Sequence, residues 1–247
     1  MHPSLKQNQL YITVDIMIMT VRKGKLLLLL SKRKDPPYAD HWALPGKLVE
    51  QNETAEAAVR RLLEEMLPGP EPYIEQLYTF TGVDRDPRGR VISLTYLVCV
   101  PWAKLQPFLP FSTFHCFHLT SEEERLGLKD ENGDMLQEQS LAFDHGHIIR
   151  TGLTRLRGKI DYSEIGFSFL EDPQAFSLSE LQNVFEAVMD SALDASNFRR
   201  FIRTRYEKSG RIKLIDKEEK RGRGRPANLY RLSDEQNDCV KGGAENE

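Results

Sequence analysis

The amino-acid sequence predicts an α/β protein of two domains, an α/β sandwich followed by a smaller domain of helices and one β-hairpin. Three observations lead to this prediction. Strand-like apolar segments alternate with turns around one helical segment in the first half, helical periodicity dominates the second half, and basic residues gather near its end. With 247 residues, of which 40% are hydrophobic, the chain has the composition of a globular protein and the length of two domains.

The domain boundaries follow from changes in these patterns. We place the sandwich at residues 8–145 and the second domain at residues 146–233, in which residues 146–159 form a linking helix. The polar segment 234–247 is expected to be disordered because it holds few apolar residues that could enter a core.

Two strands open the first domain and form a hairpin. Residues 11–21 and 25–33 are rich in apolar and β-branched residues, and Lys23-Gly24 between them is typical of a hairpin turn. The leucine run at 26–30 is far shorter than the roughly 20 apolar residues that a membrane span needs. We therefore interpret this run as a buried strand.

A helix follows at residues 53–66, where apolar side chains recur at helical spacing, and Pro68-Gly69-Pro70 ends it. Two further strands are predicted at residues 73–83 and 91–100, on either side of the turn-rich segment 84–90. The segment that comes next, up to residue 140, has no clear pattern. Its part 108–119 favours a strand, and we expect its polar part 120–140 to be a surface excursion.

The cysteines and the start of the chain bear on its location. Cys99, Cys116 and Cys239 are widely spaced, which fits reduced thiols better than a disulfide framework or a zinc site. The first residues lack the cationic and apolar pattern of a signal peptide. We therefore expect a cytoplasmic protein.

Two helices follow the linking helix in the second domain. Ser177 or Ser179 can cap the first of them, and its apolar face is formed by Leu181, Val184, Phe185 and Val188. The segment 197–210 predicts a second helix with apolar residues on one face and arginines on the other, and Gly210 ends it.

A hairpin completes the second domain, since residues 211–219 and 228–232 can pair around a basic loop. Helix, turn, arginine-rich helix and basic hairpin indicate a winged helix-turn-helix, which binds duplex DNA. The RGRP sequence of the loop resembles the core of minor-groove hooks. The candidate DNA-binding residues are Arg199, Arg200, Arg203, Arg205, Arg223, Arg225 and Asn228.

Charge is divided unevenly along the chain, although the net charge is only −3. Residues 195–233 contain 13 Lys and Arg against 4 acidic residues, a net charge of about +9. Residues 1–194 carry a net charge of about −8. An acidic body with a basic end indicates that the end meets a polyanion.

Residues 42–67 resemble a Nudix box, whose family pattern is G-x5-E-x7-R-E-U-x-E-E-x-G-U with U an aliphatic residue. Starting from Gly46, the spacing is kept while three defining positions differ. The pattern falls on Asn52 instead of glutamate, Arg60, Arg61 instead of glutamate, the pair Glu64 and Glu65, and Leu67 instead of glycine. In an alternative register Glu53 takes the first glutamate position, with one residue too few before Arg60.

In Nudix hydrolases, carboxylates of this box hold a divalent metal ion that polarises the attacking water. Arg61 places a fixed positive charge there, and it lies one helical turn from Glu64 and Glu65, so we expect it to neutralise them. Metal binding by these two glutamates and hydrolysis should then be weak or absent, and no catalytic residue is assigned. The pocket still suits a pyrophosphate, and its candidate ligand-binding residues are Arg33, Gly46, Arg61 and Glu65.

Both halves together are similar to the Nudix-related transcriptional regulators of the NrtR type, over about residues 10–232. The resemblance is carried by WALPG at 42–46, EPYIEQLYTF at 71–80, LAFDH at 141–145 and RGRPANLY at 223–230. It implies a Nudix-like α/β/α sandwich that senses ADP-ribose or a similar phosphorylated sugar. It further implies a winged helix that represses genes of NAD or related sugar metabolism, a homodimer on a palindromic operator, and no required cofactor.

The mechanism that we expect is a change in the angle between the domains when ligand binds, transmitted through residues 144–159. Asp144 and His145 lie at this hinge. They are candidates for coupling or for contact with the ligand, or else serve as a helix cap and a surface histidine.

Two other functions stay open at this point. One is a hydrolase of ADP-ribose-like nucleoside diphosphate sugars that also binds DNA, with Mg²⁺ held by Glu64, Glu65 and either Glu50 or Glu53. The other is an RNA-binding hydrolase, which the lack of clustered aromatic residues in the basic end disfavours. The effector, the regulated operon and the direction of the ligand's effect on DNA binding are also open.

Overall fold

The computed structural model describes residues 9–111, 113–122, 125–219 and 227–233. By its internal contacts the chain divides into two compact units. The first unit comprises residues 1–171 and 184–190, and the second comprises residues 172–183 and 191–247. Within the described ranges, no helix is both long and apolar enough to cross a membrane.

A mixed β-sheet forms the frame of the first unit. Its strands are β1 (Leu10–Arg22), β2 (Lys25–Lys32), β3 (Trp42–Ala43), β4 (Gly46–Leu48), β5 (Tyr73–Phe80), β6 (Arg90–Cys99), β7 (Phe114–Glu122), β8 (Arg125–Lys129) and β9 (Met135–Leu136). The strand order is β5-β6-β1-β2-β7-β8-β9, with β3 beside β2 and β4 beside β1. β1 and β6 are parallel, and the other pairs are antiparallel.

The N-terminal hairpin forms as predicted. Arg22 pairs with Lys25 across the turn, and both turn residues, Lys23 and Gly24, have positive φ angles of 50° and 69°. Glycine adopts such angles without steric cost, which favours a tight turn here. Within the leucine run, Leu26, Leu28 and Leu30 have no exposed surface, so the run is a buried strand as expected.

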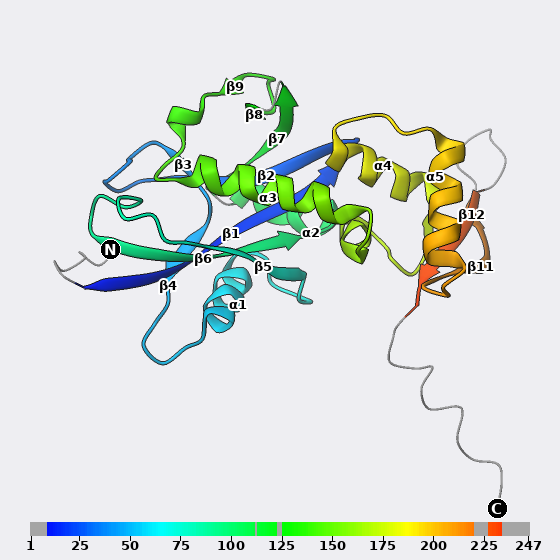
Figure 1. The fold of residues 1–247 in the computed structure, drawn as a ribbon, viewed down its shortest axis with the longest axis horizontal. Coiled ribbons are helices and arrows are strands. Elements are labelled where there is room, and N and C mark those ends of the chain that lie inside the picture. Colours follow the sequence, from blue (N-terminus) through cyan, green and yellow to red (C-terminus); the bar gives the residue numbers. More distant parts are fainter. Residues whose placement is uncertain (1–8, 112, 123–124, 220–226, 234–247) are drawn as a thin grey trace, which may run out of the picture. The chain divides into compact units, whose positions relative to one another are not determined.

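Helices α1 (Ala55–Met66) and α3 (His145–Ile160) cover opposite faces of the sheet (Figure 1). Along β1, Ile16 and Ile18 belong to the apolar core that α1 covers, whereas Met17 lies against Gly152 of α3. Successive side chains of a strand point to opposite faces, so the two helices enclose the sheet between them. The predicted α/β/α sandwich is confirmed.

Helix α1 begins two residues later than predicted. The hydroxyl of Thr54 accepts a hydrogen bond from the backbone N–H of Ala57 at 3.1 Å, which caps the helix. Glu53 therefore lies before the helix, where its carboxylate accepts the N–H of Glu50 at 2.8 Å. At the other end, the backbone N–H of Leu67 donates to the carbonyl oxygen of Leu63 before the Pro-Gly-Pro segment.

Residues 120–140 do not form the surface excursion that we predicted, because β7 and β8 pair as a hairpin and β9 joins them. Leu119 and Leu128 face each other across this hairpin, and each is only 1% exposed. The short strand was missed because its apolar part, residues 126–128, lies between two runs of charged residues. The rest of this region contains α2 (Trp102–Leu105) and two 3-10 helices, η1 (Gln106–Phe111) and η2 (Glu138–Ser140).

The boundary between the units falls after residue 171, whereas we predicted it after residue 145. The predicted linking helix exists as α3, but it belongs to the first unit. Its side chains Ile148, Ile149 and Leu156 have no exposed surface, and the helix packs near β5. Helical periodicity predicts such an apolar face but not the element that covers it. The 3-10 helix η3 (Glu164–Phe169) follows α3 in the same unit.

The second unit holds the elements of the predicted helix-turn-helix and wing. The helical elements are α4 (Leu178–Met189), α5 (Ala195–Ile202) and a π-helical turn (Arg203–Glu207). The last residues of α4, from residue 184 on, are assigned to the first unit. A small sheet has the strand order β10 (Phe176–Ser177), β12 (Ala227–Leu232) and β11 (Ile212–Glu219). Ser177 is the residue that caps α4: its hydroxyl accepts the N–H of Glu180 at 3.2 Å, and its own N–H donates to the Glu180 carboxylate at 2.7 Å. The loop 220–226 and the segment 234–247 lie outside the described residues.

Candidate functional site

A charged pocket of about 90 Å³ lies beside the start of β4. It is lined by residues from β1, β4 and β6, from the segments after β2 and before β4, from the loop 81–89 and from the start of α3 with the segment before it. Its polar and aromatic lining residues are Thr13, Asp15, Arg33, Lys47, Arg85, Asp86, Arg88, Phe143 and His145. Gly46 lies in the wall, where it faces β1: a Cβ atom there would come within 2.2 Å of the Asp15 carboxylate and 2.9 Å of the Val14 carbonyl oxygen. Only glycine fits this position without a shift of the neighbouring strand.

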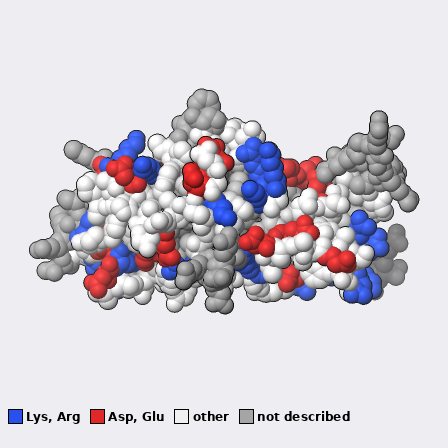
Figure 2. All heavy atoms as spheres, turned by 90° about the horizontal axis from the view of Figure 1, so that it is seen from above, with Lys and Arg blue, Asp and Glu red and all other residues white. Residues whose placement is uncertain are grey.

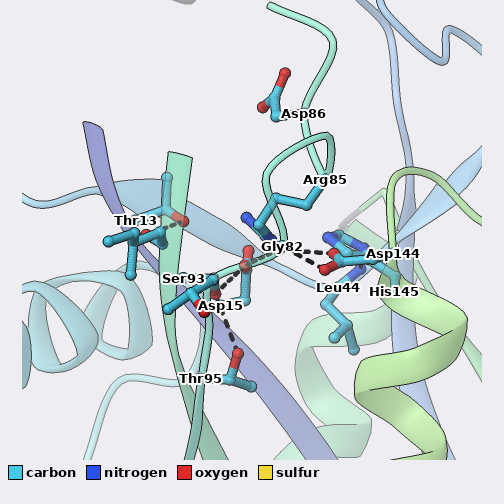
Figure 3. A network of polar contacts seen from close by, with 12 residues as sticks. Thr13, Asp15, Leu44, Gly82, Arg85, Asp86, Ser93, Thr95, Asp144 and His145 are labelled. Atoms are coloured by element: carbon cyan, nitrogen blue, oxygen red, sulfur yellow. Dashed lines mark hydrogen bonds and ion pairs between the residues drawn. The ribbon is translucent and has the colours of Figure 1, made fainter. Parts of the chain in front are cut away.

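Arg85 is the centre of a buried ionic network behind this pocket. Its side chain is 4% exposed and donates two hydrogen bonds to Asp144, at 3.0 and 2.7 Å. Asp15 lies 3.7 Å from the same guanidinium and accepts the hydroxyl proton of Ser93 at 2.5 Å. Figure 3 shows Asp15 and Asp144 converging on Arg85 from two different elements. These carboxylates offset the high cost of a buried guanidinium, and they tie the loop 81–89 to the start of α3.

His145 is buried, with 4% of its surface exposed, so it is not the surface histidine that we had considered. Its Nδ1 accepts the backbone N–H of Leu44 at 2.9 Å. Burial lowers the pKa of His145, and the charges of Arg85 and Arg33 add to this effect against the opposing carboxylates of Asp15 and Asp144. The imidazole is therefore neutral, with its proton on Nε2. Asp144 makes no capping hydrogen bond with its side chain, which instead holds Arg85.

Two arginines lie against the ring of Phe143. The guanidinium carbon of Arg33 is 4.7 Å from the ring centre, and that of Arg88 is 5.3 Å from it. Arg88 donates two hydrogen bonds to the buried carboxylate of Asp86, at 2.9 and 2.6 Å. Burial alone would raise the pKa of Asp86, but these hydrogen bonds and charges hold it below its usual value. Burial and the nearby charge of Arg88 lower the pKa of Arg33.

On the Nudix-like helix, Arg61 does not neutralise Glu64 and Glu65 by direct pairing as we predicted. It donates two hydrogen bonds to Glu53, at 3.1 and 2.5 Å, and lies 3.6 Å from Glu50. Because α1 starts at residue 55, Glu53 can turn back toward the helix. Arg61 therefore pairs with a carboxylate that has little exposed surface. Helical spacing does not predict this pair, because Glu53 lies outside the helix.

Two of the candidate metal-binding carboxylates are already paired with cations. Glu53 is held by Arg61, and Glu65 forms an ion pair with Lys47. Hydrogen bonds from Arg61 are the main cause that lowers the pKa of Glu53, which is therefore an anion already paired with a cation. Across the described part of the chain, no three His, Cys, Asp or Glu side chains are grouped so that they could hold a metal ion. A divalent cation would meet two fixed positive charges in addition to carboxylates.

Of the predicted ligand-binding residues, the pocket brings together Arg33 and Gly46. Arg61 and Glu65 lie on α1 and do not line it. Sequence reasoning missed Arg85, Arg88 and Phe143. A signal existed for them, because three arginines gather in the turn between two strands at 84–90, and Phe143 stands in the LAFDH segment that we had singled out.

The second unit presents arginines on one face of α5 and of the π-helical turn that follows it. Phe198, Ile202 and Tyr206 are buried on the opposite side, and Asp194 caps the helix by accepting the N–H of Asn197 at 2.8 Å. The candidate DNA-binding residues that are exposed are Arg199, Arg200, Arg203, Arg205 and, on β12, Asn228. Arg223 and Arg225 lie outside the described residues. Exposed guanidinium groups along one helical face suit contacts with phosphates and base edges.

Comparison with known proteins agrees with both halves. The family model of the NUDIX domain matches residues 10–139, and that of the NrtR DNA-binding winged helix domain matches residues 166–232. A relative from Acinetobacter baylyi, described as ADPR responsive transcriptional repressor NtrR, is 33% identical over 223 residues, which cover 90% of this chain and 81% of the relative. The chain belongs to the NrtR family. The resemblance seen in the sequence is thereby confirmed.

Two further comparisons show similarity of this NrtR-family member to a solved regulator structure and to an enzyme. The crystal structure of Shewanella oneidensis NrtR complexed with a 27mer DNA is 30% identical and superposes with a TM-score of 0.73, covering 90% of this chain and 93% of that one. An ADP-ribose pyrophosphatase of Methanocaldococcus jannaschii is 31% identical over 147 residues, which cover 59% of this chain and 77% of the relative.

Proposed function

We propose that this NrtR-family protein is a transcriptional repressor that binds duplex DNA and responds to ADP-ribose. The observation that carries the proposal is the 33% identity, over 90% of the chain, to a relative described as an ADPR responsive transcriptional repressor. The arginine-lined pocket of the first unit and the arginine-rich face of α5 supply a site for an anionic ligand and a site for DNA.

The same proposal includes how the protein reads its operator. It acts in the cytoplasm as a homodimer that binds a palindromic duplex, because two-fold symmetry presents two winged helices to two half-sites. It requires no cofactor, and it controls genes of NAD or related sugar metabolism.

Hydrolysis of ADP-ribose is the second candidate function. The relative described as ADP-ribose pyrophosphatase favours it, since it matches 59% of this chain at 31% identity. The pairing of Glu53 with Arg61 and of Glu65 with Lys47 weighs against it, because a metal ion would have to displace both cations.

Binding of a selected operator tests the repressor. A palindromic duplex is first selected from a random pool by the full-length protein, and its binding is then measured by fluorescence anisotropy with and without ADP-ribose. We expect a Kd for this duplex far below that for a scrambled duplex and a change of at least about tenfold on addition of ADP-ribose, a coupling of about 1.4 kcal/mol. AMP at the same concentration serves as the control. An affinity that ADP-ribose leaves unchanged would exclude it as the effector.

³¹P NMR of ADP-ribose with the protein and Mg²⁺ separates the two candidates. A sensor shifts or broadens the pyrophosphate signals, and these signals persist for hours. Steady appearance of AMP and ribose 5-phosphate would establish the hydrolase instead.

A further inference from the structure

Arg33 and Arg88 each keep part of their hydrogen-bonding capacity in the pocket. Arg33 donates through Nε to the carbonyl oxygen of Pro37 and through Nη2 to that of Asp35, at 3.0 and 3.3 Å. Arg88 uses the same two nitrogens for Asp86. Within the described ranges, neither Nη1 group takes part in a hydrogen bond. Both hydrogen-bond acceptors of Arg33 are carbonyl oxygens, and the carboxylates of Asp86, Asp35 and Asp15 act on its charge without a hydrogen bond. Both groups can therefore donate to an anion.

The two guanidinium groups are also close enough to repel each other. They share the ring of Phe143, and the charge of Arg88 contributes to the lowered pKa of Arg33. In a half-buried site such repulsion is weakly screened, so an anion that lies between two cations is bound more strongly than at an exposed surface. An arginine fork matches the oxygens of a phosphate with paired hydrogen bonds.

Phe143, which lines the pocket, and Tyr38, which contacts it, both have an unusual backbone conformation. Phe143 has a φ of 53° and Tyr38 a φ of 64°, both in the left-handed region that bulky residues rarely adopt. Their rings contact each other with centres 4.9 Å apart. Such strain concentrates at binding and catalytic sites, where the surrounding structure maintains it. The strained position of Phe143 sets its ring beside Arg33 and Arg88.

The space around Arg33 suits the middle of an extended ligand. Arg33, Leu44 and Gly46 line the charged pocket and also a neighbouring hollow of about 270 Å³. In ADP-ribose the pyrophosphate is the central link, with a ribose on each side. Arg33 lines both hollows, so it lies where the central pyrophosphate would bind. The two hollows would then hold parts of the ligand on either side of the pyrophosphate.

We infer that Arg33 and Arg88 hold the pyrophosphate of the ligand beside Phe143 and that no divalent metal ion takes part in this binding. The inference rests on the proposed function for the identity of the ligand, ADP-ribose. It replaces the metal of a Nudix hydrolase by guanidinium groups, in accord with the cations that already occupy Glu53 and Glu65.

Isothermal titration of the full-length protein with ADP-ribose, in EDTA and in Mg²⁺, tests the inference. We expect the two Kd values of the wild type to agree within about twofold. Arg33→Gln and Arg88→Gln should each weaken binding at least about tenfold, because each loses a charge-assisted hydrogen bond to phosphate. Arg60→Gln is the matched control: Arg60 is an exposed arginine of α1 that pairs with Glu71 outside the pocket, and its replacement should leave the Kd unchanged.

Two further measurements keep the result interpretable. Thermal unfolding followed by circular dichroism verifies that each variant is folded, and Arg33→Lys and Arg88→Lys replace any glutamine variant that is not. The lysine variants keep the charge but lose the fork, so they too should bind ADP-ribose more weakly than the wild type.

The outcomes separate this inference from the proposed function. Wild-type affinity in both folded pocket variants, or loss of wild-type binding in EDTA, would overturn the inference and leave the effector assignment standing. A wild-type protein that binds ADP-ribose in neither buffer would overturn the effector assignment and the inference with it.

Discussion

At position 61 a guanidinium group stands where the Nudix pattern has a carboxylate, and the structure shows what that exchange does. Arg61 is bound by Glu53, which lies before the helix, and it is close to Glu50. The positive charge of Arg61 therefore neutralises acidic groups that could attract a metal ion. The exchange of one side chain thus places a cation among the carboxylates near the motif.

Removal of this cation should restore affinity for a divalent metal. In Arg61→Glu, the new carboxylate would join Glu50, Glu53 and Glu65 with no guanidinium among them. We expect Mn²⁺, followed by electron paramagnetic resonance, to bind at least about tenfold more tightly than to the wild type, because charge attraction replaces repulsion. Arg61→Gln removes the charge without adding a ligand and should gain less. Equal Mn²⁺ affinity in all three proteins would show that Arg61 does not block the site.

The buried His145 should make stability depend on pH. Its folded pKa lies below the unfolded value of about 6.5, chiefly because burial penalises the charged form. Below about pH 6.5 the unfolded chain therefore binds more protons than the folded one, and the free energy of unfolding falls. Between pH 7.5 and 5.5 the Tm of the wild type should fall more than that of His145→Gln, which keeps an acceptor for the N–H of Leu44 but does not titrate. Parallel loss of Tm in both proteins would exclude His145 as the cause.

At the scale of elements, α3 connects the pocket to the sheet. Asp144 at its start holds Arg85, and Gly152 in its middle allows the helix to approach β1 closely. A Cβ atom at Gly152 would lie 2.3 Å from the sulfur of Met17 and 3.2 Å from a methyl carbon of Leu77. Position 152 thus fixes the distance between helix and sheet.

A larger side chain at position 152 should destabilise the first unit. Gly152→Leu introduces a large side chain into a filled core, and we expect it to lower the free energy of unfolding by about 1–3 kcal/mol. Gly158→Ala in the same helix is the control: nothing lies within 4 Å of its added Cβ, so it should raise stability by about 0.5–1 kcal/mol. Urea unfolding of both variants measures this. Unchanged stability in Gly152→Leu would mean that the helix can shift at no cost.

Over the whole molecule, charge is divided unevenly along the sequence. Residues 1–194 carry about −8 and residues 195–233 about +9. On the face drawn in Figure 2, acidic and basic side chains lie interspersed rather than in one field of a single sign. The exposed arginines of α5 and of the turn that follows it are therefore the described candidates for local contact with phosphate.

Loss of one of these arginines should weaken DNA binding in a salt-dependent way. Arg203 is exposed and lies 3.8 Å from Glu207, a distance at which an exposed pair contributes little to folding. If Arg203 contacts a phosphate, Arg203→Ala should weaken binding to all duplexes alike and reduce the slope of log K against log salt by about one. Arg60→Ala, in the other unit, should leave that slope unchanged. A slope equal to that of the wild type would remove Arg203 from the interface.

Much of the fold was predictable because its signals are local. Lys23-Gly24 specifies a hairpin turn, Pro68-Gly69-Pro70 stops a helix, and the apolar spacing of α3 and α5 marks one buried face on each. The strand β8 was missed because its apolar part is only three residues long and lies between two runs of charged residues, and Leu128 is its one leucine that is almost fully buried. The candidate site was only partly predictable, since Arg33 and Gly46 lie near the motif whereas Arg88 and Phe143 do not.

The sequence by itself determined most of the elements, the family, the altered Nudix box and the basic winged helix, because the signal for each lies in neighbouring residues. Tertiary structure alone decided which charges meet. Arg61 pairs with Glu53 rather than with the glutamates one turn away, and Arg85 joins Asp15 to Asp144 from the other end of the domain. A side chain takes the partner that the packed loops bring within reach, and sequence spacing predicts that partner only inside a single helix or hairpin.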